Sequence, residues 1–239
     1  MFKLALGAGH GRDTAGKRCL KSLDPNETRE WWLNDRICDL IEAELREYEG
    51  VSLLRLDDSD DGAEDVALAE RVSEANAWGA DFYLSIHHNA GVNGGTGGGI
   101  VAFSHPKAGK DTVEWRNELY EALVERTGLR GNRSKPKAES DLYVLRKTAM
   151  PSVLLELGFM DSQTDVPIIL TDEYAHECAV AIADVIVRRA RLTKRDNPDS
   201  WAADAWARAK KAGVMDGTRP KDNVTRQELA QVLKNLGLI

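Results

Sequence analysis

The stretch Asp81-Phe-Tyr-Leu-Ser-Ile-His-His-Asn-Ala90 decides the fold class, because in it a short apolar run leads directly into polar side chains. Five similar short runs occur in the first 190 residues, at 2–7, 51–56, 99–103, 142–145 and 152–157. Apolar residues at helical spacing fill the stretches between them, at 28–48, 64–78, 110–127 and 172–190. This alternation predicts an α/β fold with a mixed, largely parallel sheet flanked by helices.

The composition is that of an ordinary globular protein, with 42% hydrophobic and 30% charged residues in a chain of 239. No apolar stretch approaches the roughly 18 residues of a membrane span, so we expect no membrane insertion. The run 1–7 lacks the features of a secretory signal, which predicts synthesis in the cytoplasm without a signal peptide. Cys19, Cys38 and Cys178 are odd in number and widely spaced, which predicts reduced thiols.

The net charge of −7 is unevenly distributed along the chain. Residues 191–239 contain 10 basic and 6 acidic side chains and carry +4, so the first 190 residues carry −11. An acidic main body argues against nucleic acid as a partner. The basic tail favours an anionic partner, although such a difference is also found between two ordinary solvated surfaces.

The C-terminal residues form a separate small unit in this interpretation. Residues 191–200 are polar and contain Asn-Pro, which indicates a linker between a domain at 1–190 and a helical module at 201–239. The module is predicted to be two short helices around the turn 213–217, and Thr225-Arg-Gln-Glu228 has the form of a capping box. About 40 residues is near the lower limit for an independent core, so we expect this module to dock or to pair with a copy of itself.

Two histidines follow predicted strands, namely His10 after 2–7 and His87 after 81–86. The carboxyl ends of parallel strands meet at one edge of a sheet, and a crossover connection would bring Glu30 to that edge as well. Two imidazoles and one carboxylate form a known catalytic zinc set that leaves a fourth position open. The alternative is that each histidine is an ordinary residue at a strand end.

Glu156 interrupts an apolar strand, in Ser152-Val-Leu-Leu-Glu-Leu-Gly-Phe159. A carboxylate in such a run is costly to bury unless it has a partner. Beside a metal it could accept a proton from water, as a general base does. The alternative is a buried glutamate bonded to backbone or to an arginine such as Arg146.

Several motifs stand in a recognisable order: Gly9-His10-Gly11, Glu30-Trp-Trp-Leu-Asn34, Arg71-Val-Ser-Glu-Ala-Asn76, Ser85-Ile-His-His-Asn-Ala90 and Pro151-Ser-Val-Leu-Leu-Glu-Leu-Gly-Phe159. Over residues 2–190 the chain resembles the zinc-dependent N-acetylmuramoyl-L-alanine amidases of the type 3 family. The resemblance implies Zn²⁺ on His10, Glu30 and His87, with Glu156 as the catalytic carboxylate. It implies hydrolysis of the amide bond between N-acetylmuramic acid and L-alanine in bacterial peptidoglycan.

The sequence departs from the family pattern at two places near this site. His88 stands where the family more often has alanine. Neighbouring strand residues point to opposite faces, so we do not expect His87 and His88 both to bind one metal. We expect His88 to pack, and contact with the substrate is the alternative. Gly7-Ala8-Gly9 stands where the family often has Asp-Pro-Gly. Glu27 is a rival ligand, but only Glu30 has Asn four residues later. The glycine-rich segment 91–99 is expected to be a flexible loop beside the site.

The tail, with Trp201-Ala-Ala-Asp-Ala-Trp206, Gly213-Val-Met-Asp-Gly217 and Asn223-Val-Thr-Arg-Gln-Glu-Leu-Ala230, resembles an S-layer homology unit. The resemblance implies binding to a secondary wall polymer, or a homodimer formed through this single copy. With no signal peptide expected, the whole is typical of a phage endolysin that reaches the cell wall by another route, such as a lysis pore. The alternatives are a zinc peptidase that cuts the stem peptide, and a wall-binding protein without activity.

Overall fold

The computed structural model describes residues 1–58, 60–195, 198, 201–215 and 224–238. The chain divides into two compact units, Met1–Thr193 and Lys194–Ile239. None of the described helices is both long enough and apolar enough to cross a membrane. The assignment of a catalytic domain, a linker and a wall-binding module to parts of the chain stays a prediction.

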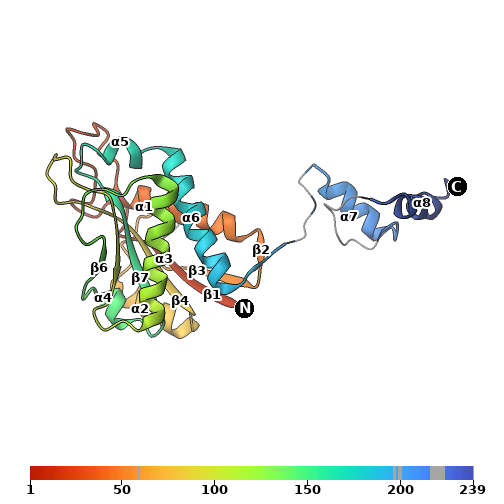
Figure 1. Ribbon diagram of the computed structural model, residues 1–239, viewed down its shortest axis with the longest axis horizontal. Helices are drawn as coiled ribbons and strands as arrows, with labels where there is room; N and C mark the ends of the chain where they lie inside the picture. Colours follow the sequence, from red (N-terminus) through yellow and green to blue (C-terminus); the bar gives the residue numbers. More distant parts are fainter. Residues whose placement is uncertain (59, 196–197, 199–200, 216–223, 239) are drawn as a thin grey trace. The chain divides into compact units, whose positions relative to one another are not determined.

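A six-stranded sheet in the order β3-β1-β4-β7-β5-β6 forms the centre of the first unit (Figure 1). Four adjacent strands run parallel to one another: β3 (Val51–Arg55), β1 (Phe2–Ala8), β4 (Phe82–Asn89) and β7 (Ser152–Phe159). Next, β5 (Ile100–Ser104) runs antiparallel to β7, and β6 (Lys137–Glu139) runs parallel to β5. The predicted mixed, largely parallel sheet is confirmed.

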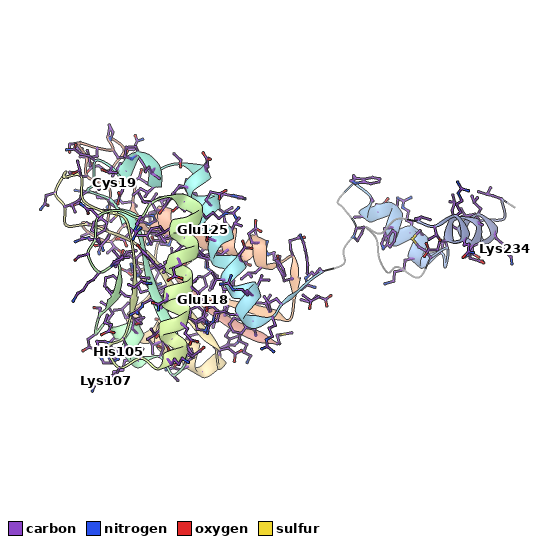
Figure 2. All side chains as sticks on the ribbon, in the orientation of Figure 1. Cys19, His105, Lys107, Glu118, Glu125 and Lys234 are labelled. Atoms are coloured by element: carbon purple, nitrogen blue, oxygen red, sulfur yellow. The ribbon has the colours of Figure 1, made fainter. Side chains whose placement is uncertain are left out.

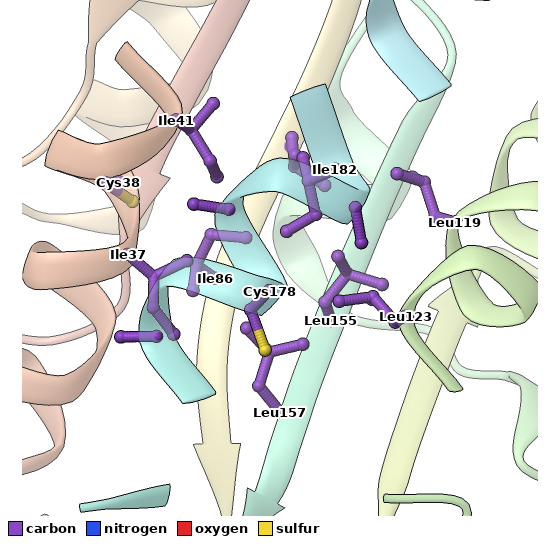
Figure 3. Packing of buried hydrophobic residues seen from close by; sticks show 14 of the residues in the cluster. Ile37, Cys38, Ile41, Ile86, Leu119, Leu123, Leu155, Leu157, Cys178 and Ile182 are labelled. Carbon is purple, nitrogen blue, oxygen red and sulfur yellow. The ribbon is translucent and has the colours of Figure 1, made fainter. Parts of the chain in front are cut away.

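Helices cover both faces of this sheet. The helices of the first unit are α1 (Glu30–Leu45), α2 (Leu68–Trp78), α3 (Lys110–Thr127), α4 (Tyr143–Lys147), α5 (Val166–Ile169) and α6 (Asp172–Ala190). On one face, Ile37 of α1, Leu119 of α3 and Ile182 of α6 belong to the same buried cluster as Leu155 of β7 (Figure 3). On the other face, residues of α2 and α4 pack in a smaller cluster with Leu154. Consecutive residues of β7 therefore enter opposite layers, as the pleat of a strand requires.

The cysteines belong to the protein interior. Cys19, Cys38 and Cys178 are all buried and free, and Figure 3 shows Cys38 and Cys178 among the packed aliphatic side chains. Burial raises the pKa of Cys19 to about 12, and carboxylates nearby act in the same direction. The expectation of reduced thiols is confirmed, and these thiols are poor nucleophiles.

One predicted element is wrong and others were missed. The run 142–145 was expected to be a strand but lies at the beginning of helix α4, where Leu145 and Arg146 donate backbone hydrogen bonds to Leu142. Periodicity cannot distinguish a strand from a helical turn in four apolar residues, and packing against α2 decides here. Strand β6 was missed because Lys-Ala-Glu has no apolar pattern. The short strands β2 (Tyr48–Glu49) and β8 (Thr193–Lys194), which form a separate two-stranded sheet, were missed as well.

The second unit contains the two short helices that were predicted, α7 (Ala203–Lys211) and α8 (Arg226–Asn235). Thr225 caps α8 in a complete capping box with Glu228, as expected. Neither helix contains a buried residue. Parts of two tail motifs, residues 216, 217 and 223, lie outside the described residues.

Candidate metal centre and active site

Three segments bring His10, Glu30 and His87 together at the carboxyl edge of the sheet. His10 lies two residues after β1, Glu30 is the first residue of α1, and His87 lies within β4. One ligand atom from each residue lies within 4.8 Å of the others. The structure thus brings together the three predicted ligands, although β4 continues past His87 to Asn89 instead of ending at residue 86.

The two imidazoles converge on one oxygen of Glu30. Nε2 of His10 lies 3.4 Å from Oε1 of Glu30, and Nδ1 of His87 lies 3.1 Å from the same atom. The other oxygen, Oε2, is buried and finds no hydrogen-bond partner among the described residues, and Nζ of Lys17 lies 3.7 Å away. A buried carboxylate oxygen without a hydrogen bond is costly, and a cation would satisfy it. The donor set therefore fits Zn²⁺.

The electrostatics of these groups also suit a cation. Burial lowers the pKa of His10 to about 4, against the opposing effect of Glu30, so this imidazole is neutral near pH 7. Burial alone would raise the pKa of Glu30, but its hydrogen bond with His87 and the charges around it bring the pKa down to about 2. A neutral imidazole with a free lone pair and an ionised carboxylate are the forms that bind a metal.

Backbone contacts hold the His10 segment in position. Arg71 donates to the carbonyl oxygens of Ala8 and His10, and Oδ1 of Asp57 accepts the N–H of Ala8 at 2.9 Å. His10 has φ of +65°, a conformation that is uncommon outside glycine and is stabilised here by these contacts. Gly9 packs directly against the His87 ring, and an added Cβ would overlap that ring. The motif therefore requires glycine at position 9, because a side chain there would overlap the His87 ring.

Asn34 lies one helical turn after Glu30 in α1 and forms hydrogen bonds with the His10 segment and with the strand that carries His87. Its Nδ2 donates to the carbonyl of Gly9 at 3.2 Å, and its Oδ1 lies 2.8 Å from Nδ1 of His88. His88 is buried, as expected, and burial lowers its pKa to about 3. Its backbone N–H donates to Oε1 of Glu30. A register irregularity lies between His87 and Asn89, where two residues of β4 face three residues of β7.

Glu156 lies beside His87, because the two are paired residues on the neighbouring parallel strands β7 and β4. Its Oε2 is buried and has no hydrogen-bond partner in the described part of the chain. Burial raises the pKa of Glu156 to about 7, although the charge of His87 opposes this. Arg146 forms its ion pair with Asp141 at 2.8 Å. The suggested alternative, a Glu156–Arg146 pair, is therefore wrong.

The remaining candidates lie apart from this group. Glu27 forms ion pairs with Arg18 and Lys21, at 3.1 Å and 3.6 Å, and is not among the clustered ligands. Segment 91–99 is a loop, as expected, and carboxylates accept hydrogen bonds from its backbone. Oδ2 of Asp161 accepts three successive backbone N–H groups, those of residues 91–93, and Asp165 accepts that of Gly99. Sequence reasoning missed Asp57, Asp161 and Asp165, which act through the backbone and leave no pattern of spacing.

Comparison with known proteins decides the family. The model of the N-acetylmuramoyl-L-alanine amidase family matches residues 4–188, which include all four of the candidate site residues. The chain belongs to this amidase family. The match covers most of the first unit and none of the second.

Relatives of this amidase include bacterial and phage proteins. The N-acetylmuramoyl-L-alanine amidase CwlM of Bacillus licheniformis is 31% identical over 230 residues, which cover 90% of this chain and 85% of the relative. The endolysin of Bacillus phage SPP1 is 29% identical over 82% of this chain and 69% of its own length. Among solved structures, the amidase AmiC2 of Nostoc punctiforme is 25% identical with a TM-score of 0.68, over 80% of this chain and 97% of that one.

Proposed function

We propose that this amidase hydrolyses the bond between the lactyl group of N-acetylmuramic acid and L-alanine in peptidoglycan, with Zn²⁺ held by His10, Glu30 and His87. Family membership supports the reaction. The observation that carries the mechanism is the pairing of Glu156 with His87, one of the candidate ligands, on adjacent strands. A zinc ion in such a site polarises a carbonyl and lowers the pKa of water.

Glu156 acts as the proton carrier in this proposal. A carboxylate whose pKa is raised towards 7 by burial is suited to accept a proton from the attacking water and to release it again. Glu156 would then deliver that proton to the departing nitrogen of L-alanine. No serine or cysteine nucleophile is required, and the three cysteines are buried.

For the second unit we propose binding to the cell wall. Its S-layer-homology-like motifs and its excess of basic residues support a secondary wall polymer as its ligand, with pairing of two copies as the alternative. The similarity to the endolysin of phage SPP1 supports a lytic role at the bacterial wall.

The test is mass spectrometry of purified peptidoglycan after digestion by the native protein, by Glu156→Gln and by native protein treated with a zinc chelator. We expect stem peptides with free L-alanine N-termini, a rate about 10²–10⁴-fold lower for Glu156→Gln, and recovery of the chelated sample on adding Zn²⁺. Glu27→Gln is the matched control and should retain activity, because Glu27 pairs with Arg18 and Lys21.

Other products would point to the alternatives. Cleavage within the stem peptide would replace the proposal by a zinc peptidase. Wall binding without any cleavage would replace it by a binding protein that has no activity. Full activity after exhaustive chelation would contradict the role of zinc but not the identity of the cleaved bond.

A further inference from the structure

Two loops of opposite charge border the candidate site at the carboxyl edge of the sheet. Residues 57–65, which follow β3, contain six carboxylates and no basic side chain. Residues 128–136, which connect α3 to β6, contain three basic side chains and no carboxylate. Because β3 and β6 are the two outer strands, the site on β1, β4 and β7 lies between these loops. The anionic part of a substrate that extends beyond the site would be attracted towards the basic loop.

The basic loop lies at the same edge as Glu156. Strand β5 is antiparallel to β7, so its first residue, Ile100, lies where β7 ends. The N–H of Ile100 donates to the carbonyl of Leu129, and that of Gly98 donates to Oδ1 of Asn132. These bonds fix the basic loop against the glycine-rich segment that follows the His87 strand.

Within this loop, the guanidinium of Arg133 is positioned to bind a carboxylate. Its guanidinium carbon lies 4.4 Å from the ring centroid of Phe159, the last residue of β7. Arg133 is exposed and, among the residues that the structure describes, forms no ion pair, whereas Lys137 is paired with Glu121 at 2.9 Å. Burial raises the pKa of Asp165 and the charge of Arg133 acts to lower it, and Oδ2 of Asp165 accepts the backbone N–H groups of Gly99 and Phe159. A guanidinium stacked by one face keeps its edge donors for a carboxylate.

The spacing suits a peptide that extends from the reacting bond. Phe159 follows Glu156 by three residues, but a register irregularity lies between them, so the two positions span the length of two residues of β4, about 7 Å. An extended peptide covers this distance in about two residues. We propose that Arg133 binds a carboxylate of the stem-peptide residue that follows L-alanine, and so favours stems in which that carboxylate is free. This inference rests on the proposed function, whose site it extends.

The experiment compares two soluble muropeptides that differ only in the second stem residue, which has a free α-carboxylate in one and a carboxamide in the other. We expect Arg133→Gln to raise KM for the carboxylate form by about three- to tenfold with little change in kcat, as suits one charge-assisted contact that is partly open to solvent. KM for the carboxamide form should stay within about twofold. Arg133→Lys retains the charge but not the planar fork, and should lie between the two.

Lys107→Gln is the matched control, because it removes an exposed charge just after β5, at the opposite edge of the sheet (Figure 2). It should leave both KM values unchanged. Equal effects of Arg133→Gln on the two muropeptides, or no effect on either, would overturn the inference while the proposed function stands. If the native protein cleaves neither muropeptide at the L-alanine bond, the proposed function fails and the inference fails with it.

Discussion

At the residue scale, the candidate site depends on side chains that position the candidate ligands through hydrogen bonds. Asn34 is fully buried and bonds to both Gly9 and His88, so it fixes the His10 segment and the His87 strand relative to Glu30. Arg71 supports the same segment through two carbonyl oxygens. Such groups affect the candidate metal site without being ligands, and their loss should appear in metal affinity as well as in stability.

We expect Asn34→Ala to lower the free energy of unfolding by about 2 kcal/mol, because it leaves buried partners on Gly9 and His88 without hydrogen bonds. Zinc affinity should fall by about 10–100-fold, as for other residues that orient ligands. Urea unfolding and competition with a chromophoric chelator would measure the two effects.

Asn76→Ala is the control for this variant. Asn76 also bridges two backbone groups, the carbonyl of Lys147 and the N–H of Ala149, but these precede β7 and lie at the other end of the strand from the site. It should reduce stability and leave zinc affinity unchanged. Unchanged zinc affinity in Asn34→Ala would show that Asn34 serves the fold alone.

At the scale of elements, ion pairs join the helices α3 and α6. Glu118 of α3 accepts hydrogen bonds from Arg188 at 2.8 Å and from Arg189 at 2.5 Å. Arg189 also stacks on Trp115, with its guanidinium carbon 4.5 Å from the ring centroid. Burial alone would raise the pKa of Glu118, but the hydrogen bonds from these arginines lower it below 4.5.

A lowered pKa means that Glu118 stabilises the fold when it is ionised. We therefore expect Glu118→Gln to cost about 1 kcal/mol of unfolding free energy at pH 7, as for a partly exposed pair. The difference from the native protein should shrink as the pH falls below about 4.5, where the native carboxylate takes up a proton. Urea unfolding at several pH values measures this.

Glu125→Gln is the matched control on the same helix (Figure 2), because Glu125 is exposed. It should change stability little at any pH. A difference between Glu118→Gln and the native protein that persisted at pH 3 would show that the effect is not electrostatic.

At the scale of the whole molecule, the two units differ in how they are stabilised. The first unit contains both buried clusters around its sheet, whereas α7 and α8 contain no buried residue. Several apolar side chains of the second unit are exposed, including Trp201 at 86% and Leu238 at 66%. The fold of the first unit should therefore not depend on the second.

We expect residues 1–195 produced alone, which include both strands of the β2-β8 sheet, to keep the free energy of unfolding of the first unit within about 0.5 kcal/mol. This fragment should cleave soluble muropeptides at the rate of the full chain and bind intact cell walls more weakly. Calorimetry, a cleavage assay and a wall pull-down would test the three points. Equal wall binding by the fragment and the full chain would contradict a wall-binding role for the second unit.

The fold class and the candidate residues could be predicted from the sequence alone. The alternation of apolar runs and amphipathic stretches predicted the mixed sheet, and the motifs around His10, Glu30, His87 and Glu156 predicted which residues would meet. The alternation is a local pattern, because a strand or helix with one buried face repeats along the chain with a fixed period, whereas the motifs indicate the site residues through the family resemblance. The same holds for Thr225, whose capping box is complete within four residues.

Tertiary structure decided what depends on contacts between distant segments. The run 142–145 is helical because of its packing against α2, and β6 is a strand only because it pairs with β5. The roles of Asp57 and Arg71 arise from backbone groups far away in the sequence, which periodicity cannot reveal. The raised pKa of Glu156 has the same origin, since burial by the whole fold sets the cost of its charge.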